Sequence, residues 1–451
     1  MRRLGLLAVA VTILGVAILA GASISRWYFT RELGACESAL RASGVALTLD
    51  ELNTLYDSVC SANEAASLYK MAFAEVDECA RSFAANIQPD TVPWLTDVDL
   101  GILRSALGPN RRALELLREA TRFPCARFSL EDVSLALATN RPIDLDVWPM
   151  RQLRHTPQLW SLAAMEALAS GDSALAMTYV EAMIVLARQI ALVPSSDAIW
   201  VCHACLDSAK TLLVTGMRHG LWTFADLQQA VSMLADCNLL LPNANWDRDY
   251  VATIMSQGPP VPAMRMMGEE ALTELLSLER DDASALGSVI GPLVDLLGAT
   301  LNYARYDLHV SVPFMRAELA CARVPRNLSF KESHPRIEKA AKLCTMETTA
   351  ILLWGMRYRL IAEGRLLQAA CVIECARLEG AEYPTNLDNL VAREPALVFT
   401  DPFDGAQLRY RTEREGFVVY SVGENLKDDG GKTWSQEYRE LREDITLDLS
   451  R

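Results

Sequence analysis

The stretch GDSALAMTYVEAMIVLARQIALVPSS, residues 171–196, decides the fold class of this chain. Its apolar residues recur at the three- and four-residue spacing of one helix face. They are Leu175, Val180, Met183, Ile184, Leu186, Ala187 and Ile190. Gly171-Asp172 precedes this face and Pro194 follows it, so the sequence predicts a helix between these two breaks. Because such a helix is stable only when its apolar face is packed, the stretch predicts an array of helices.

Further helices are predicted on both sides of this stretch. The same two breaks divide residues 150–220 into three helices. Thr48-Leu-Asp-Glu51 and Thr223-Phe-Ala-Asp226 have the pattern of a capping box, which predicts two more helix starts. The Gly-Asp break between alanine-rich helices resembles a tetratricopeptide hairpin, but the chain has no 34-residue period. We therefore expect an irregular antiparallel helical array over residues 29–335.

The N-terminus carries an apolar segment. Arg2 and Arg3 precede an uncharged run over residues 4–25, which is long enough to span a bilayer as a helix. Trp27-Tyr28 suits the far membrane interface, where aromatic rings settle. Residues 1–28 are therefore predicted to form an uncleaved anchor that contacts the membrane through residues 4–25.

Two alternatives accompany this anchor. Ala20-Gly21-Ala22 fits the cleavage pattern of a signal peptide, so removal of the segment stays open. A second apolar stretch, residues 283–304, is interrupted by glycines, a proline and Asp295, and is predicted to be a buried helical hairpin. Positive charge before the anchor slightly exceeds that of Arg26 and Arg31 after it. We therefore expect a single-pass protein of the inner membrane with its body outside the cytoplasm.

Composition excludes some classes of function. The chain has 57 acidic and 43 basic residues and a net charge of −14, which argues against a nucleic-acid partner. Its five histidines have no metalloprotease spacing, and no nucleophile elbow, phosphate-binding loop or dinucleotide fingerprint is present. No catalytic motif therefore indicates an enzyme. An active site assembled from residues distant in sequence stays an alternative.

Eleven cysteines are scattered along the chain and form no disulfide framework. Cys202-His203-Ala204-Cys205 lacks the histidine that haem attachment requires after the second cysteine. One alternative to burial in a helix core is a structural zinc bound by these two cysteines together with Cys371 and Cys375. A disulfide or redox role is the other. Burial is the preferred interpretation, because cysteine is among the most buried residue types.

The texture of the sequence changes towards the C-terminus. A long helix is predicted from Ile337 to Leu378. Residues 407–411 and 417–420 are predicted to be strands, and the glycine-containing loop between them predicts a β-hairpin. Residues 336–434 are therefore expected to form a small α+β module that includes the long helix. Residues 435–451 are expected to form a charged tail, in which the charge-dense residues 437–448 form a solvated helix or remain part of the tail.

An ordered set of motifs runs through residues 364–431. It comprises Gly380-x-x-Tyr383-Pro384, then Leu387 and Leu390, Asp401-Pro402-Phe403 with Gly405, Leu408-x-Tyr410, and Tyr420-Ser421-x-Gly423 leading to Asp428-Asp429-Gly430-Gly431. This set resembles the C-terminal part of the major pseudopilin of type II secretion systems. The resemblance implies that a helix carries a small sheet in this region.

The whole layout is similar to a group of uncharacterised membrane-anchored bacterial proteins with a helical middle and a pseudopilin-like end. The matching features are Leu47-Thr-Leu-Asp-Glu-Leu52, Asn63-Glu-Ala-Ala66 and the Gly171-Asp172 helical pair. The chain departs from pilin-like proteins near its start, because Phe29-Thr30-Arg31-Glu32 follows the apolar run and lacks a preceding glycine. Processing and assembly as a pseudopilin are therefore not expected.

The resemblance also implies a metal. Major pseudopilins bind calcium in the loop after their final strand, which carries over to Asn425, Asp428, Asp429 and Asp444 as calcium ligands. Calcium needs six to eight oxygens, and Asn425 stands where an aspartate is expected. The alternative is an Asp-Gly turn fixed by its own hydrogen bonds, with no metal or other cofactor.

The sequence thus predicts a membrane-anchored envelope protein that acts in protein interaction or as a scaffold, with a protein partner in the envelope. An accessory component of a type II secretion or pilus-like machine is one alternative. An enzyme of unknown class is the other.

Overall fold

The computed structural model describes a large part of the chain. These are residues 20, 24, 27, 31–32, 34–42, 49–60, 64–76, 97–128, 150–193, 198–235, 328–341, 347–388, 390, 397–413, 416–431 and 444–450. The predicted anchor over residues 4–25 lies almost entirely outside them, and the apolar stretch 283–304 lies wholly outside.

The chain divides into two compact units. The smaller unit comprises residues 1–48, 251–325 and 335–351, and the larger comprises 49–250, 326–334 and 352–451. In the smaller unit, the helical residues 34–42 bury Leu40 and place Arg41 Nη1 3.6 Å from Glu37 Oε2. The predicted division into residues 29–335 and 336–434 stays a prediction.

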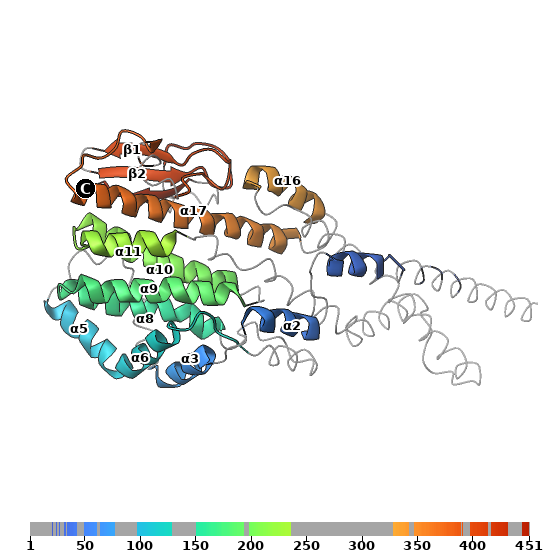
Figure 1. The fold of residues 1–451 in the computed structure, drawn as a ribbon, viewed down its shortest axis with the longest axis horizontal. Coiled ribbons are helices and arrows are strands. Elements are labelled where there is room, and N and C mark those ends of the chain that lie inside the picture. The colour runs from blue at the N-terminus through green and yellow to red at the C-terminus, as the bar shows by residue number, and fades with distance from the viewer. Residues whose placement is uncertain are drawn as a thin grey trace, which may run out of the picture. The chain divides into compact units, whose positions relative to one another are not determined.

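The described residues are mainly helical, as predicted (Figure 1). The helices are α2 (Leu49–Val59), α3 (Glu64–Glu75), α5 (Asp97–Leu107), the 3₁₀ helix η2 (Gly108–Asn110), α6 (Arg111–Ala120), α8 (Met150–Ala169), α9 (Ser173–Ala191), α10 (Ala198–Arg218), α11 (Phe224–Leu234), α16 (Phe330–Ala341) and α17 (Glu347–Leu378).

Helices α8, α9 and α10 form the centre of the array and contact one another (Figure 1). The three helices predicted within residues 150–220 are therefore confirmed. Gly171, at a φ of +79°, takes the left-handed conformation that ends α8. The Asp172 side chain then caps α9 by accepting a hydrogen bond from Leu175 N at 2.9 Å. The capping box predicted at Thr223 and Asp226 is present at the start of α11.

Helix α9 is the one described helix that is long and apolar enough to cross a membrane. Most of its apolar window is buried against other parts of the protein, with Val180, Met183 and Ile190 fully buried. A helix that is apolar on most sides and packed in this way belongs to the core of the array. The predicted span over residues 4–25 is a different segment, which α9 does not test.

A disulfide bond joins Cys60, at the end of α2, to Cys125, which follows α6. The two Cα atoms lie 5.8 Å apart, within the usual range for a disulfide. Beside it, the Tyr56 hydroxyl donates to the Ala126 carbonyl at 2.7 Å. The sequence did not indicate this pairing, because the two cysteines are 65 residues apart.

The C-terminal module contains an antiparallel sheet in the order β1-β2-β3. Its strands are β1 (Arg409–Glu413), β2 (Gly416–Ser421) and β3 (Ile445–Asp448). The predicted hairpin is confirmed, but its first strand lies two residues later than predicted. In the register of the sheet, Val419 stands opposite Tyr410 on β1 and opposite Leu447 on β3.

The prediction of a solvated tail is wrong at residues 445–448, which form β3. Leu447 and Leu449 are buried, and Ile445 packs against the core of the module. Apolar residues alternate at these three positions as in a strand, but the surrounding charges concealed so short a pattern.

Helix α17 carries this sheet module in the larger unit. Tyr358 and Ile361 of α17 form one apolar core with Phe330, Phe403 and Val422. The rings of Phe330 and Phe403 lie 5.2 Å apart in an edge-to-face arrangement, which aromatic pairs favour. The sheet lies beside α17 (Figure 1), and this buried aromatic cluster joins the C-terminal module to the helix.

Candidate functional site

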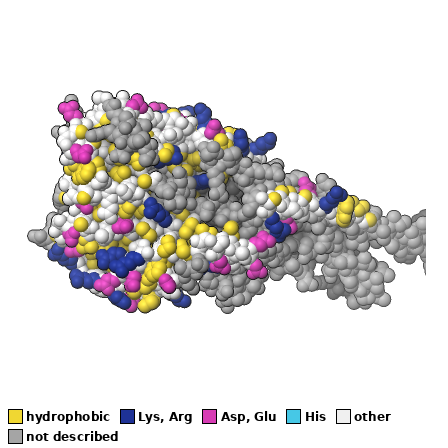
Figure 2. Space-filling model, viewed as in Figure 1, with side chains coloured by type: hydrophobic (Ala, Val, Ile, Leu, Met, Phe, Trp, Pro, Cys, Tyr) yellow, Lys and Arg dark blue, Asp and Glu magenta, His cyan; other side chains and the backbone are white. Residues whose placement is uncertain are grey.

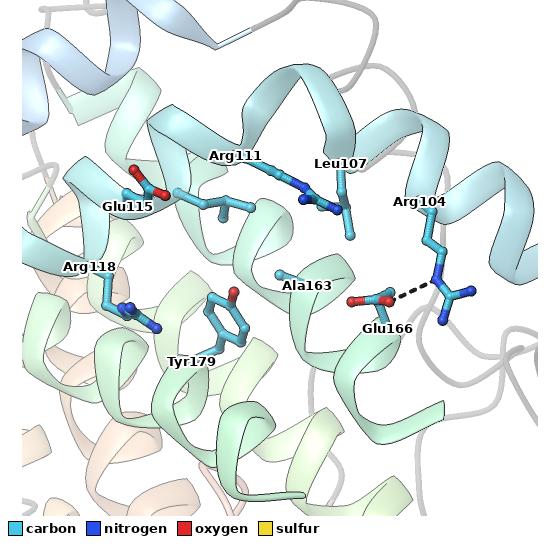
Figure 3. Close-up of a pocket in the computed structure, with 9 residues that line it drawn as sticks. Arg104, Leu107, Arg111, Glu115, Arg118, Ala163, Glu166 and Tyr179 are labelled. Carbon is cyan, nitrogen blue, oxygen red and sulfur yellow. Dashed lines mark hydrogen bonds and ion pairs between the residues drawn. The ribbon is translucent and has the colours of Figure 1, made fainter. Parts of the chain in front are cut away.

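A cavity of about 250 Å³ lies on the helical array of the larger unit. Helices α5, α6, α8 and α9 supply its walls (Figure 3). The lining residues are Arg104, Leu107, Arg111, Leu114, Glu115, Arg118, Ala163, Glu166 and Tyr179. On the molecular surface, basic side chains gather over α5 and α6 (Figure 2). The cavity thus combines an apolar floor with a largely basic rim.

Sequence spacing places the arginines around this cavity. Arg111 and Arg118 are seven residues apart on α6, which is about two helical turns, so both lie on one side of the helix. Arg104 stands seven residues earlier, on α5. Leu107 and Leu114 have the same spacing and are both buried, which gives the cavity its apolar floor.

The charged groups of the rim differ in their partners. Arg104 Nε lies 2.9 Å from Glu166 Oε1, and Arg104 Nη2 donates to Ser170 Oγ at 3.1 Å. The guanidinium groups of Arg111 and Arg118 form no ion pair or hydrogen bond with any residue that the structure describes. Both side chains are exposed, so these two guanidiniums are available to a ligand.

Tyr179 reaches the cavity from α9 and lies between α8 and α6 (Figure 3). Burial raises the pKa of its hydroxyl above the ordinary value, and Glu166 adds to this while Arg118 opposes it. The hydroxyl is therefore protonated at neutral pH and can donate a hydrogen bond. Two guanidiniums and a phenol form a set of donors suited to a carboxylate or another small anion.

The predicted calcium ligands are brought together at the C-terminal sheet. Asn425 Nδ2 donates to Asp429 Oδ2 at 2.7 Å, and Gly431 N donates to an oxygen of Asp444 at the same distance. Asp428 Oδ1 accepts from Gly430 N at 3.0 Å. These bonds support the alternative interpretation, a turn held by its own hydrogen bonds.

One oxygen of this loop differs from the rest. Asp444 Oδ1 is buried and has no hydrogen-bond partner among the described residues. Burial raises the pKa of this carboxyl, and backbone N–H groups at Gly431 and Asp429 partly offset the rise. Within the described ranges, no three acidic, histidine or cysteine side chains are placed to hold one metal ion. The loop side chains hold one another, and the calcium site and the self-bonded turn both stay untested interpretations of this loop.

Cys202 and Cys205 are fully buried in α10. Cys202 Sγ donates to the Ala187 carbonyl of α9 at 3.3 Å, and burial raises the pKa of both thiols far above its ordinary value. Cys371 of α17 is buried as well, and all three are free thiols. Their surroundings support the core interpretation, because a protonated buried thiol is a poor ligand and nucleophile.

Comparison with known proteins adds no relative. No protein-family model, curated protein or solved structure matches this chain.

The sequence interpretation did not single out the arginines of the cavity. A signal for them is present, because Arg104-Ser-Ala-Leu107 is repeated seven residues later as Arg111-Arg-Ala-Leu114. Within each copy, the arginine and the leucine are three residues apart and lie on the same side of their helix. It was hidden by the more general amphipathic pattern of the array.

Proposed function

We propose that the chain is a membrane-anchored envelope protein that binds another protein through its helical array. The observation that carries this proposal is the cavity with the guanidiniums of Arg111 and Arg118 on its rim, neither of which has a partner among the described residues. Exposed, unpartnered arginines beside buried apolar side chains are typical of protein interfaces, in which arginine is enriched.

Two exposed apolar side chains support the anchor. Ile24 is 67% exposed and Trp27 is 63% exposed, although both are large apolar residues. Arg31 lies over the Trp27 ring at 5.7 Å, an arrangement suited to the membrane interface. Ile24 lies at the end of the uncharged run that is proposed to span the bilayer, and Trp27 and Arg31 follow it.

The disulfide bond supports the location of the body. Disulfides form and persist in oxidising compartments and are rare in the reducing cytosol. The Cys60–Cys125 bond therefore favours a body outside the cytoplasm. Protease treatment of spheroplasts tests this location with a tag placed after Arg451. Digestion of the tag before lysis is expected, and protection of the tag until lysis would contradict the proposal.

Site-specific photo-crosslinking in intact cells tests the binding function. A photoreactive residue replaces Glu115 on the cavity rim, and the matched control replaces Glu379, an exposed glutamate that follows α17. We expect a discrete protein adduct at the rim and none at the control. If rim and control give the same products, the array is not the binding surface.

The alternatives have less support. The secretion-machine alternative rests on the resemblance of residues 364–431 alone. For an enzyme, the polar groups of the cavity are arginines, glutamates and a tyrosine. Of the glutamates, Glu166 is already held in an ion pair with Arg104. These groups favour holding an anion over activating a nucleophile.

A further inference from the structure

We infer that the cavity binds a short acidic and apolar peptide segment of the partner. An apolar side chain of that segment fills the floor of the cavity, and neighbouring carboxylates contact Arg111 and Arg118. This inference rests on the proposed function and names the chemistry of the partner.

The position of Arg111 is unfavourable for the helix that holds it. Helix α6 begins with Arg111 and Arg112 and has no acidic residue in its first turn. The positive end of the helix dipole disfavours cations at that place. Arg112 is paired with Glu115 at 3.2 Å, whereas Arg111 has no described partner. A residue that opposes local stability without compensation is typical of a functional position.

The net charge of the protein sharpens this contrast. The chain carries 14 more acidic than basic residues, so intramolecular partners for an arginine are abundant. Arg111 and Arg118 nevertheless face the cavity without one in the described part of the chain. An acidic segment from another protein provides the complementary charge.

The size of the cavity favours a peptide over a cofactor. Its volume of about 250 Å³ is smaller than the roughly 300–1,000 Å³ typical of small-molecule sites. Leu107, Leu114 and Ala163 line it with apolar surface. One or two apolar side chains of an extended or helical segment match this space.

The two glutamates of the rim restrict the anion. Glu115 and Glu166 lie beside the arginines, and they repel an anionic group that concentrates more than one negative charge at the rim (Figure 3). A single carboxylate accepts two parallel hydrogen bonds from one guanidinium and adds only one charge. The Tyr179 hydroxyl offers a further donor on the α9 side. A carboxylate therefore fits the rim better than a phosphate monoester, which carries up to two charges on one group.

Fluorescence anisotropy with defined peptides tests the inference on the full chain in detergent micelles. The probes are short peptides in which leucine alternates with aspartate, asparagine or lysine. We expect the aspartate peptide to bind most tightly. The double change Arg111→Glu and Arg118→Glu should weaken it by about tenfold or more, because charge-assisted hydrogen bonds are lost. The double variant should also reverse the preference towards the lysine peptide.

Arg122→Glu is the matched control, since Arg122 is an exposed arginine close to the end of α6 that does not line the cavity. It should leave affinity within about twofold of the wild type. If the double variant does not fold, Arg111→Gln with Arg118→Gln, and rising salt on the wild type, test the same charge dependence.

Equal binding of the aspartate and asparagine peptides would overturn the inference. So would arginine-dependent binding to phosphatidylglycerol vesicles without binding to the aspartate peptide, which would assign the site to lipid. A crosslinked partner at the rim without peptide preference would leave the proposed function standing and remove this inference alone. Binding of the aspartate peptide without any crosslinked partner in cells would remove the proposed function, and the preference of the cavity for acidic peptides would stand.

Discussion

Lys210 Nζ on α10 lies 3.4 Å from Glu363 Oε1 on α17, so one ion pair joins the helical array to the helix that carries the sheet. Glu363 is only 2% exposed, and Lys210 is also 2.8 Å from Asp207 Oδ1. Arg359 Nε approaches the same oxygen of Glu363 at 3.3 Å. The pair therefore belongs to a small network of charged side chains on α10 and α17.

Lys210→Met should lower the free energy of unfolding by roughly 3 kcal/mol, since removal of one partner leaves Glu363 buried with less compensation. Arg359 remains near Glu363, which keeps the loss at the lower end of the range for buried pairs. Urea denaturation of the full chain in detergent measures it. Adding Glu363→Leu to Lys210→Met should restore part of the stability. The exposed control Lys427→Met should have no effect, and equal midpoints for all variants would refute a role for the pair.

The Cys60–Cys125 bond closes a loop between residues 65 apart in sequence. Replacing both cysteines with serine should cost about 2–5 kcal/mol of stability, as removal of native disulfides does. Thermal denaturation with and without reductant measures the cost. Reductant should destabilise the wild type and leave the double-serine variant unchanged. A wild type insensitive to reductant would show that the bond is absent or contributes nothing.

Asp444→Asn should raise stability near neutral pH. The pKa of Asp444 is raised in the folded protein by burial, so its favourable contribution is present below the unfolded value of about 3.9 and is lost as the pH rises through the folded pKa. The amide oxygen can still accept from Gly431 N. Thermal melting across a range of pH should give the variant a higher melting temperature than the wild type at neutral pH and the same melting temperature in acid. A variant less stable than the wild type at every pH would contradict this assignment.

Calcium provides a separate test of the same loop. Because Asn425, Asp428 and Asp429 are engaged in the hydrogen bonds of the turn, millimolar calcium should leave the melting temperature unchanged. Magnesium serves as the control for non-specific effects. A calcium-specific rise that Asp428→Asn abolishes would show instead that the loop rearranges to bind the ion.

Much of the helical core follows from local sequence patterns. The Gly171-Asp172 break, the apolar face after it and the capping box at Thr223 each act within a few residues, so their consequences are visible in the sequence. The first strand of the hairpin lies two residues later than predicted, because Thr412 and Glu413, which the sequence places in the loop, belong to β1. Local signals locate elements more reliably than their ends.

The remaining features depend on proximity in space. Cys60 and Cys125 meet only because α3 packs against α6, and that packing cannot be deduced from cysteine spacing. The alternation of apolar residues in β3 is too short to predict a strand by itself, and β3 forms only by pairing with β2. The cavity likewise requires α8 and α9 opposite Arg111 and Arg118. In each case the feature is formed by residues that are distant in sequence.

The most direct measurement combines the rim crosslink with the arginine change in intact cells. A photoreactive residue at Glu115 should give a protein adduct in the wild type, and that adduct should disappear with Arg111→Glu and Arg118→Glu but persist with Arg122→Glu. This result would show that a protein partner reaches the cavity through its arginines. An adduct equally strong in all three backgrounds would contradict the account.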